Sequence, residues 1–149
     1  MILADVFMAS SDDHHIKKEE EVDEYLKKVK KCLADDSSWI INCKCWSDGR
    51  VNKTQVFLAE KNLRDEDVAN VIRELTVENY SYTASDRNAK FPNEFFWFLG
   101  IKKCIIDSEE KLYIKLKIRE LEDDVLLVMS FHPEQPSNTG NGLKFPYAK

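Results

Sequence analysis

The sequence has no apolar run of roughly eighteen residues, the length that a membrane-spanning helix requires. Its first residues also lack the basic leader of a secretory signal, and their short apolar stretch is interrupted at Asp5. We therefore expect a chain that is neither inserted in a membrane nor exported, and that stays in the cytoplasm.

The cysteines lack the spacing of a zinc site. Cys43 and Cys45 are separated by one residue, whereas structural zinc sites use a C-x₂-C pair together with a second pair or with histidines. Cys32 and Cys104 have no cysteine nearby in the sequence. We interpret all four as reduced, partly buried thiols, with an interchain disulfide as the alternative, and we expect no metal and no other cofactor.

An excess of positive charge is also missing. The chain carries 27 acidic and 22 basic residues, which give a formal net charge of −5 at pH 7. Proteins that hold nucleic acids through phosphates usually present a basic surface. The charge balance therefore counts against a nuclease and favours a protein partner, unless basic side chains gather locally.

The composition is that of one folded domain. Of the 149 residues 43% are hydrophobic, and eight Phe, five Tyr and three Trp give bulk to a single core. The polar residues up to position 15 and the Pro-, Ser- and Asn-containing residues 133–149 predict flexible ends. One domain is expected between them, over residues 16–132.

The first half of this domain has helical periodicity. Apolar residues recur over 16–33 at the spacing of one helix face, and they are Val22, Tyr25, Leu26, Val29 and Leu33. A second helix is expected over 52–61, because Asn52 is a good capping residue and Gln55 follows three positions later. An acidic turn at 65–67 opens a third helix.

The second half predicts a sheet. Residues 78–90 form a polar, tyrosine-bearing stretch without a clear period, which we interpret as a functional loop. Three β-prone segments follow at 94–106, 111–120 and 125–131, and a shorter one precedes the second helix at 39–43. We expect an α+β domain in which N-terminal helices pack on one face of an antiparallel sheet.

Alternation within the last two strands separates an apolar row from a polar row. The apolar row contains Leu112, Ile114, Leu116 and Ile118 of the middle strand and Val125, Leu127, Met129 and Phe131 of the last strand. The polar row contains Tyr113, Lys115, Lys117, Ser130 and His132. If the apolar row packs under the helices, the polar row lies on the free face of the sheet.

The side chains of the polar row suit RNA cleavage without a metal. The 2′-hydroxyl must lose a proton, the leaving 5′-oxygen must gain one, and the added negative charge at phosphorus needs a cation. An imidazole titrates near neutrality and can act as acid or base. Outward Tyr and Lys are also common on half-exposed strands, so alternation alone does not separate a catalytic face from an ordinary surface.

Five short segments have the order and spacing of a known signature. They are Leu75-Thr-Val-Glu-Asn-Tyr80, Asp86-Arg87, Trp97-Phe98, Tyr113-Ile-Lys-Leu-Lys117 and Ser130-Phe-His132. Together they resemble the MqsR-like branch of the RelE-type endoribonuclease toxins. The resemblance implies a RelE-like fold and sequence-selective cleavage of messenger RNA by a type II toxin. It also implies neutralisation by a cognate antitoxin protein.

The resemblance also implies roles for particular residues. By position, the catalytic residues of the family correspond to Tyr113, Lys115 and His132. Contacts to RNA are expected from Arg87, Lys90, Lys117, Tyr80 and Tyr82.

Two positions depart from the family pattern. The family places a lysine just after the tyrosine of the loop, where this chain has Ser81 and Tyr82, and a Gln or Glu after the strand tryptophan, where it has Phe98. Loss of the lysine removes a cation that would stabilise the transition state. Two hypotheses therefore stand side by side. The chain is an active toxin, or it is a catalytically degenerate toxin fold, such as a phage or mobile-element protein that binds and inhibits a host protein.

Overall fold

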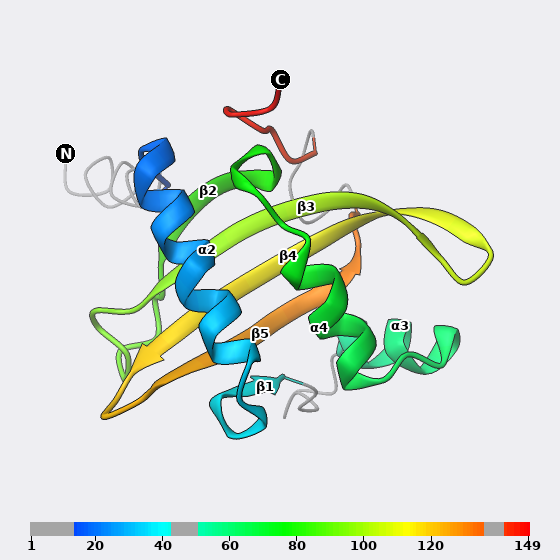
Figure 1. Cartoon of the computed structure of the whole chain (residues 1–149), viewed down its shortest axis with the longest axis horizontal. Coiled ribbons are helices and arrows are strands. Elements are labelled where there is room, and N and C mark those ends of the chain that lie inside the picture. The colour runs from blue at the N-terminus through cyan, green and yellow to red at the C-terminus, as the bar shows by residue number, and fades with distance from the viewer. Residues whose placement is uncertain (1–13, 43–50, 136–141) are drawn as a thin grey trace, which may run out of the picture.

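Three α-helices precede most of a five-stranded sheet in the computed structural model, which describes residues 14–42, 51–135 and 142–149 (Figure 1). The helices are α2 (Glu19–Leu33), α3 (Lys53–Lys61) and α4 (Asp65–Arg73), and two 3₁₀ turns are η1 (Asp36–Ser38) and η2 (Val77–Asn79). The strands are β1 (Trp39–Ile41), β2 (Tyr80–Ser85), β3 (Phe95–Ile105), β4 (Ser108–Glu120) and β5 (Asp124–Pro133). The α+β class predicted from the sequence is confirmed.

The sheet has the strand order β1-β5-β4-β3-β2. Strands β2 to β5 pair antiparallel, but β1 runs parallel to β5. The sheet is therefore mixed, whereas the sequence predicted an antiparallel sheet. No hairpin joins β1 to β5, because two helices and three strands lie between them in the chain. A tight turn therefore does not impose the antiparallel orientation on this pair.

Helices α2 and α4 cover one face of the sheet, on which α2 crosses the strands beside α4, whereas α3 lies at the outer edge of β5 (Figure 1). All five residues of the predicted α2 stripe are buried, and the ring of Tyr25 stacks on that of Trp97 with centroids 3.8 Å apart. Helix α3 begins as predicted, since Asn52 Oδ1 accepts a hydrogen bond from the Gln55 backbone N–H at 3.0 Å. The local helix signals in the sequence were therefore sufficient to locate α2 and the start of α3.

The prediction of an irregular loop over 78–90 was wrong, because residues 80–85 form β2. Tyrosine and threonine are good strand formers, and here they fill an edge strand. Thr83 is fully buried, and its Oγ1 lies 2.7 Å from Tyr80 Oη. The polar pattern of this segment thus reflects a buried hydroxyl pair and not a solvated loop.

A register shift in the β4–β5 pair changes which residues of β5 face the helices. Ile114 pairs with Phe131, whereas Leu116 pairs with Val128, so Met129 is an extra residue in β5. As a result Leu126 joins Val128 and Phe131 in the core. The predicted apolar row of Val125, Leu127, Met129 and Phe131 was therefore wrong except for Phe131, because a bulge reverses the alternation of a strand.

Residues 142–149, which the sequence assigns to a flexible end, lie against the sheet. Leu143 packs on a cluster that includes Phe98 and Tyr113, on the face opposite the helices. Tyr147 Oη donates a hydrogen bond of 2.5 Å to the carbonyl oxygen of Lys17. At the other end of the chain, His15 forms a backbone bridge with Thr83 of β2.

No helix in the described parts of the chain is long and apolar enough to cross a membrane, and no group of His, Cys, Asp or Glu suited to a metal ion occurs there. Cys32 is buried and Cys104 is exposed, and both are free thiols. Cys43 and Cys45, together with the predicted turn at 47–49, lie outside the described residues.

Candidate active site

Tyr113 and His132 lie side by side on the sheet face opposite the helices. They are register partners across β4 and β5, and their ring centroids are 5.3 Å apart with the planes inclined by 25°. Their neighbours Lys115 and Ser130 are register partners as well. Four members of the predicted polar row therefore meet on one patch of the free face.

A cavity of about 320 Å³ opens at this patch. Its lining from the sheet comprises Tyr113, Lys115, Met129, Ser130 and His132. The lining is completed by Asn42, which follows β1, and by the residues around the start of α3, namely Val51, Asn52, Lys53 and Thr54. Among the described residues no carboxylate belongs to this lining, so Lys53 and Lys115 give it a positive character in a chain of net charge −5.

The start of α3 is held at the cavity by the outer edge of β5. In the described part of the chain, β1 pairs with β5 only as far as Val128, so the edge of β5 that faces away from β4 has no strand beside it after that residue. Thr54 Oγ1 accepts a hydrogen bond from the Phe131 N–H at 2.9 Å, and the threonine is only 2% exposed. A buried N–H group needs such a partner, so this bond fixes α3 beside His132.

Sequence reasoning missed Asn52, Lys53 and Thr54 as site residues. The capping pattern located the beginning of a helix, but it contained no information on where that helix would lie in space. The pattern of the MqsR-like toxins has a lysine just after the loop tyrosine, where this chain has Ser81. In this chain a lysine at the cavity comes from α3 instead, as Lys53.

His132 has the properties of a general base. Its side chain is only 4% exposed, and Nδ1 lies 2.9 Å from the carbonyl oxygen of Pro133. Because a carbonyl only accepts, Nδ1 carries the proton in the neutral ring and Nε2 keeps a lone pair. Burial lowers the pKa of the imidazole, the bond to Pro133 opposes this, and nearby Lys53 lowers it further. The neutral form is therefore favoured.

Burial shifts the pKa of Tyr113 in the opposite direction to that of His132. The residue is 7% exposed, and burial raises the pKa of its phenol well above the usual value. Its hydroxyl has no hydrogen bond to any residue that the structure describes. The phenol thus remains protonated and can donate a hydrogen bond to a ligand in the cavity.

Lys115 is a half-buried cation among aromatic rings. Its Nζ lies 4.1 Å from the centroid of the Phe96 ring and 5.6 Å from that of Phe98. Burial lowers the pKa of the ammonium group, and Asp86 partly opposes this. Among the described residues, no carboxylate lies within ion-pair distance of it. A lowered pKa makes the ammonium a better proton donor.

The structure does not bring Lys117 to the cavity, although alternation placed it in the polar row. Its side chain is 2% exposed, and Nζ lies 2.7 Å from Asp86 Oδ2 and 2.8 Å from Glu94 Oε1. Glu94 also binds Arg119 through two hydrogen bonds, which together with Lys117 lower the pKa of its carboxyl group. Lys117 is occupied by these partners and is not exposed to RNA.

The other expected RNA contacts also lie away from the cavity. Tyr80 is fully buried on the helix face of the sheet. Tyr82 shares the face of the cavity, but on β2, where its ring stacks between His14 and Phe98. Arg87 and Lys90 are exposed between β2 and β3, and neither lines the cavity.

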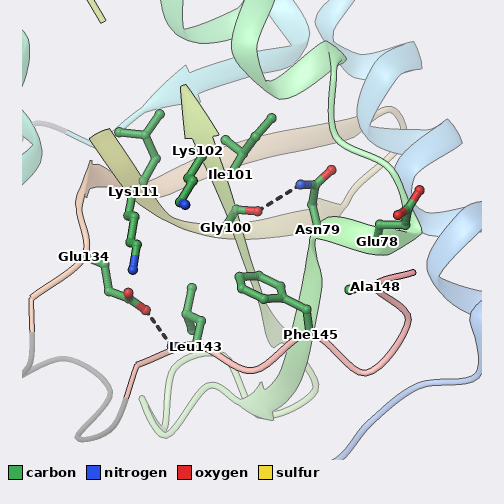
Figure 2. A pocket seen from close by; sticks show the side chains of 11 residues that line it. Glu78, Asn79, Gly100, Ile101, Lys102, Lys111, Glu134, Leu143, Phe145 and Ala148 are labelled. Carbon is green, nitrogen blue, oxygen red and sulfur yellow. Dashed lines mark hydrogen bonds between the residues drawn. The ribbon is translucent and has the colours of Figure 1, made fainter. Parts of the chain in front are cut away.

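A second cavity of about 320 Å³ lies between residues 142–149 and the sheet (Figure 2). Its lining mixes Glu78 and Glu134 with two lysines around Gly100, and it contains no imidazole or thiol. Glu134 Oε1 accepts a hydrogen bond from the Leu143 N–H, which holds the chain end in place. Of the residues assigned to catalysis by the resemblance, none lines this cavity.

Comparison with models of known protein families finds none that matches the chain, and comparison with curated proteins finds no match either. Any catalytic role for Tyr113, Lys115 and His132 is therefore inferred from their geometry and from the resemblance in the sequence.

Proposed function

We propose that the chain is a metal-independent endoribonuclease toxin of the MqsR-like, RelE-type class, which cleaves messenger RNA and is neutralised by an antitoxin protein. The observation that carries the proposal is the meeting of three groups at one cavity. They are a buried neutral imidazole from His132, a protonated phenol from Tyr113 and the ammonium group of Lys115, which has no carboxylate partner among the described residues.

These groups supply the proton transfers that RNA cleavage requires. His132 Nε2 removes the proton from the 2′-hydroxyl, and the 2′-oxygen attacks phosphorus as the bond to the 5′-oxygen breaks. Lys115 donates a proton to the leaving 5′-oxygen, and Tyr113 donates a hydrogen bond to a non-bridging oxygen. The products are a 2′,3′-cyclic phosphate and a 5′-hydroxyl, and exchange with water restores the two protonation states.

The experiment that tests the proposal is incubation of the pure protein with RNA of mixed sequence in the presence of EDTA, followed by mapping of the new ends. We expect cleavage that EDTA does not prevent. A single 2′-deoxy substitution at the mapped position should abolish cleavage there, because it removes the nucleophile. Cleavage that persists at the deoxy position would rule out the mechanism.

A non-enzymatic binding module is the second candidate. The observation in its favour is that Lys117 and Arg119, on the same face as the cavity, are neutralised by Asp86 and Glu94 in a chain of net charge −5. Such a protein would bind a host protein and leave RNA intact. Affinity capture from a host lysate separates the candidates, because a toxin should recover a small antitoxin and an inhibitor a larger host protein.

A further inference from the structure

The start of α3 lines the cavity, and two of its backbone N–H groups have no partner among the described residues. The Gln55 N–H is bonded to Asn52 Oδ1, and the Val56 N–H to the Asn52 carbonyl oxygen. The N–H groups of Lys53 and Thr54 have no hydrogen-bond partner among the described residues. Such groups at a helix start carry partial positive charge and attract anions.

Two buried side chains of the sheet line the same cavity. Tyr113 and His132 are each more than nine-tenths buried, yet Tyr113 Oη and His132 Nε2 have no partner in the part of the chain that the structure describes. Neither atom is itself enclosed, because the fully buried side-chain polar atoms without a partner in the described part of the chain are Tyr25 Oη and Trp39 Nε1. The two unpartnered groups of otherwise buried side chains are therefore open to the cavity, where a polar ligand can reach them.

The charges around the cavity specify the sign of that ligand. Lys53 and Lys115 are its only ionised lining residues among those described, and neither forms an ion pair with a described carboxylate. The cavity of about 320 Å³ has room for a phosphate group with its sugar. A cation cannot be favoured at this position, whereas an oxyanion finds donors on both sides.

We propose that the start of α3 is a phosphate subsite, in which the Lys53 ammonium group and the N–H groups of Lys53 and Thr54 bind the oxygens of one phosphate. Tyr113 and Lys115 bind the same group from the sheet. The identification of this phosphate as the scissile phosphodiester of RNA rests on the proposed function. The subsite itself follows from the donors and does not require cleavage.

Titration with inorganic phosphate tests the subsite on the whole chain, with backbone amide shifts followed by NMR and the ionic strength held constant with sodium chloride. We expect saturable shifts at Lys53 and Thr54. Lys53→Ala should weaken phosphate binding about tenfold, because one charge-assisted bond is lost. Lys30→Ala, which removes an exposed lysine of α2, is the matched control and should not change it.

Lys53→Pro separates the backbone donor from the ammonium group. Proline is well tolerated at the first position of a helix, and Asn52 already has the extended backbone that a residue before proline requires, with φ −83° and ψ 106°. The variant should fold and should bind phosphate about threefold more weakly than Lys53→Ala, since it also lacks the N–H. Equal binding by the two variants would contradict the backbone donor.

The outcome that overturns the subsite is phosphate binding by Lys53→Ala as tight as that of the unmodified protein. A second probe, a dinucleotide whose first sugar is 2′-deoxy, separates RNA from free phosphate as the source of the anion. Tighter binding of the dinucleotide than of phosphate supports the phosphodiester. Binding of phosphate at Lys53 by a protein that cleaves no RNA would refute the proposed function and leave the subsite standing.

Discussion

Tyr113 and His132 face each other across β4 and β5, and burial shifts their pKa values in opposite directions. Burial disfavours the charged form of each group, so the phenol keeps its proton and the imidazole loses its own more readily. A proton donor and a proton acceptor therefore lie in one cavity at neutral pH. Pairs of this kind are typical of acid–base sites.

The pH dependence of RNA cleavage should report His132. A base must be unprotonated, so the rate should fall as the pH drops through the imidazole pKa, with a midpoint below the usual value of 6.5. Lys53 contributes to the lowering of this pKa, and Lys53→Ala should therefore move the acidic limb to higher pH. Lys30→Ala should leave it in place. If Lys53→Ala leaves the acidic limb of the pH–rate profile unchanged, that result contradicts the proximity of Lys53 to His132.

Replacement of Tyr113 by Phe should separate activity from stability. The ring contacts with Phe98 and His132 are retained, and the lost hydroxyl has no intramolecular partner among the described residues. The free energy of unfolding, measured with urea, should change by less than about 1 kcal/mol. The maximal cleavage rate should fall about a hundredfold, because a donor to the transition state is lost. An unchanged rate would remove Tyr113 from the mechanism.

Lys117→Met should be strongly destabilising. The substitution leaves the nearly buried carboxylate of Asp86 without its cation, a change that typically costs about 3–5 kcal/mol. The matched control is Lys103→Met, which breaks an exposed ion pair with Glu74 and should cost less than about 1 kcal/mol. Asp86→Asn in the Lys117→Met background should restore part of the lost stability. Equal effects of the two lysine substitutions in urea unfolding would show that Lys117 is not a buried partner.

Gly100→Ala should displace the C-terminal segment from the sheet. A Cβ atom at this position would lie 2.9 Å from Leu143 Cδ1, 3.0 Å from Phe145 Cζ and 3.1 Å from the Leu112 carbonyl oxygen. We expect a loss of about 1–3 kcal/mol and faster proteolysis within residues 142–149. A chain that ends at residue 141 lacks Leu143 and Phe145, and it should tolerate the same substitution better. An equal loss in both chains would place the strain elsewhere.

The sequence predicted those features of the site that depend on neighbours along the chain. The alternation of β4 was sufficient to place Tyr113 and Lys115 on one face, and the capping pattern at Asn52 was sufficient to begin α3. The polar row nevertheless included Lys117, because nothing near it in sequence reveals that Asp86 and Glu94 bind it. Burial of that charge arises from segments more than twenty residues away.

Two register shifts account for most of the remaining differences. The extra residue at Met129 reverses the alternation of β5, and a second irregularity between Tyr80 and Tyr82 directs these tyrosines to opposite faces. A bulge depends on the pairing of two strands and is not visible in the pattern of one. For the same reason the position of Lys53 at the cavity could not be predicted, since it follows from the bond between Thr54 and Phe131.

The most direct test of the central claim compares RNA cleavage by the unmodified protein and by His132→Ala, with His14→Ala as the control. His14 also lies on the free face of the sheet, but outside the cavity. We predict 2′,3′-cyclic phosphate and 5′-hydroxyl ends with the unmodified protein and His14→Ala, and a loss of cleavage of at least about a hundredfold with His132→Ala. No cleavage by the unmodified protein, or equal cleavage by His132→Ala, would contradict the claim.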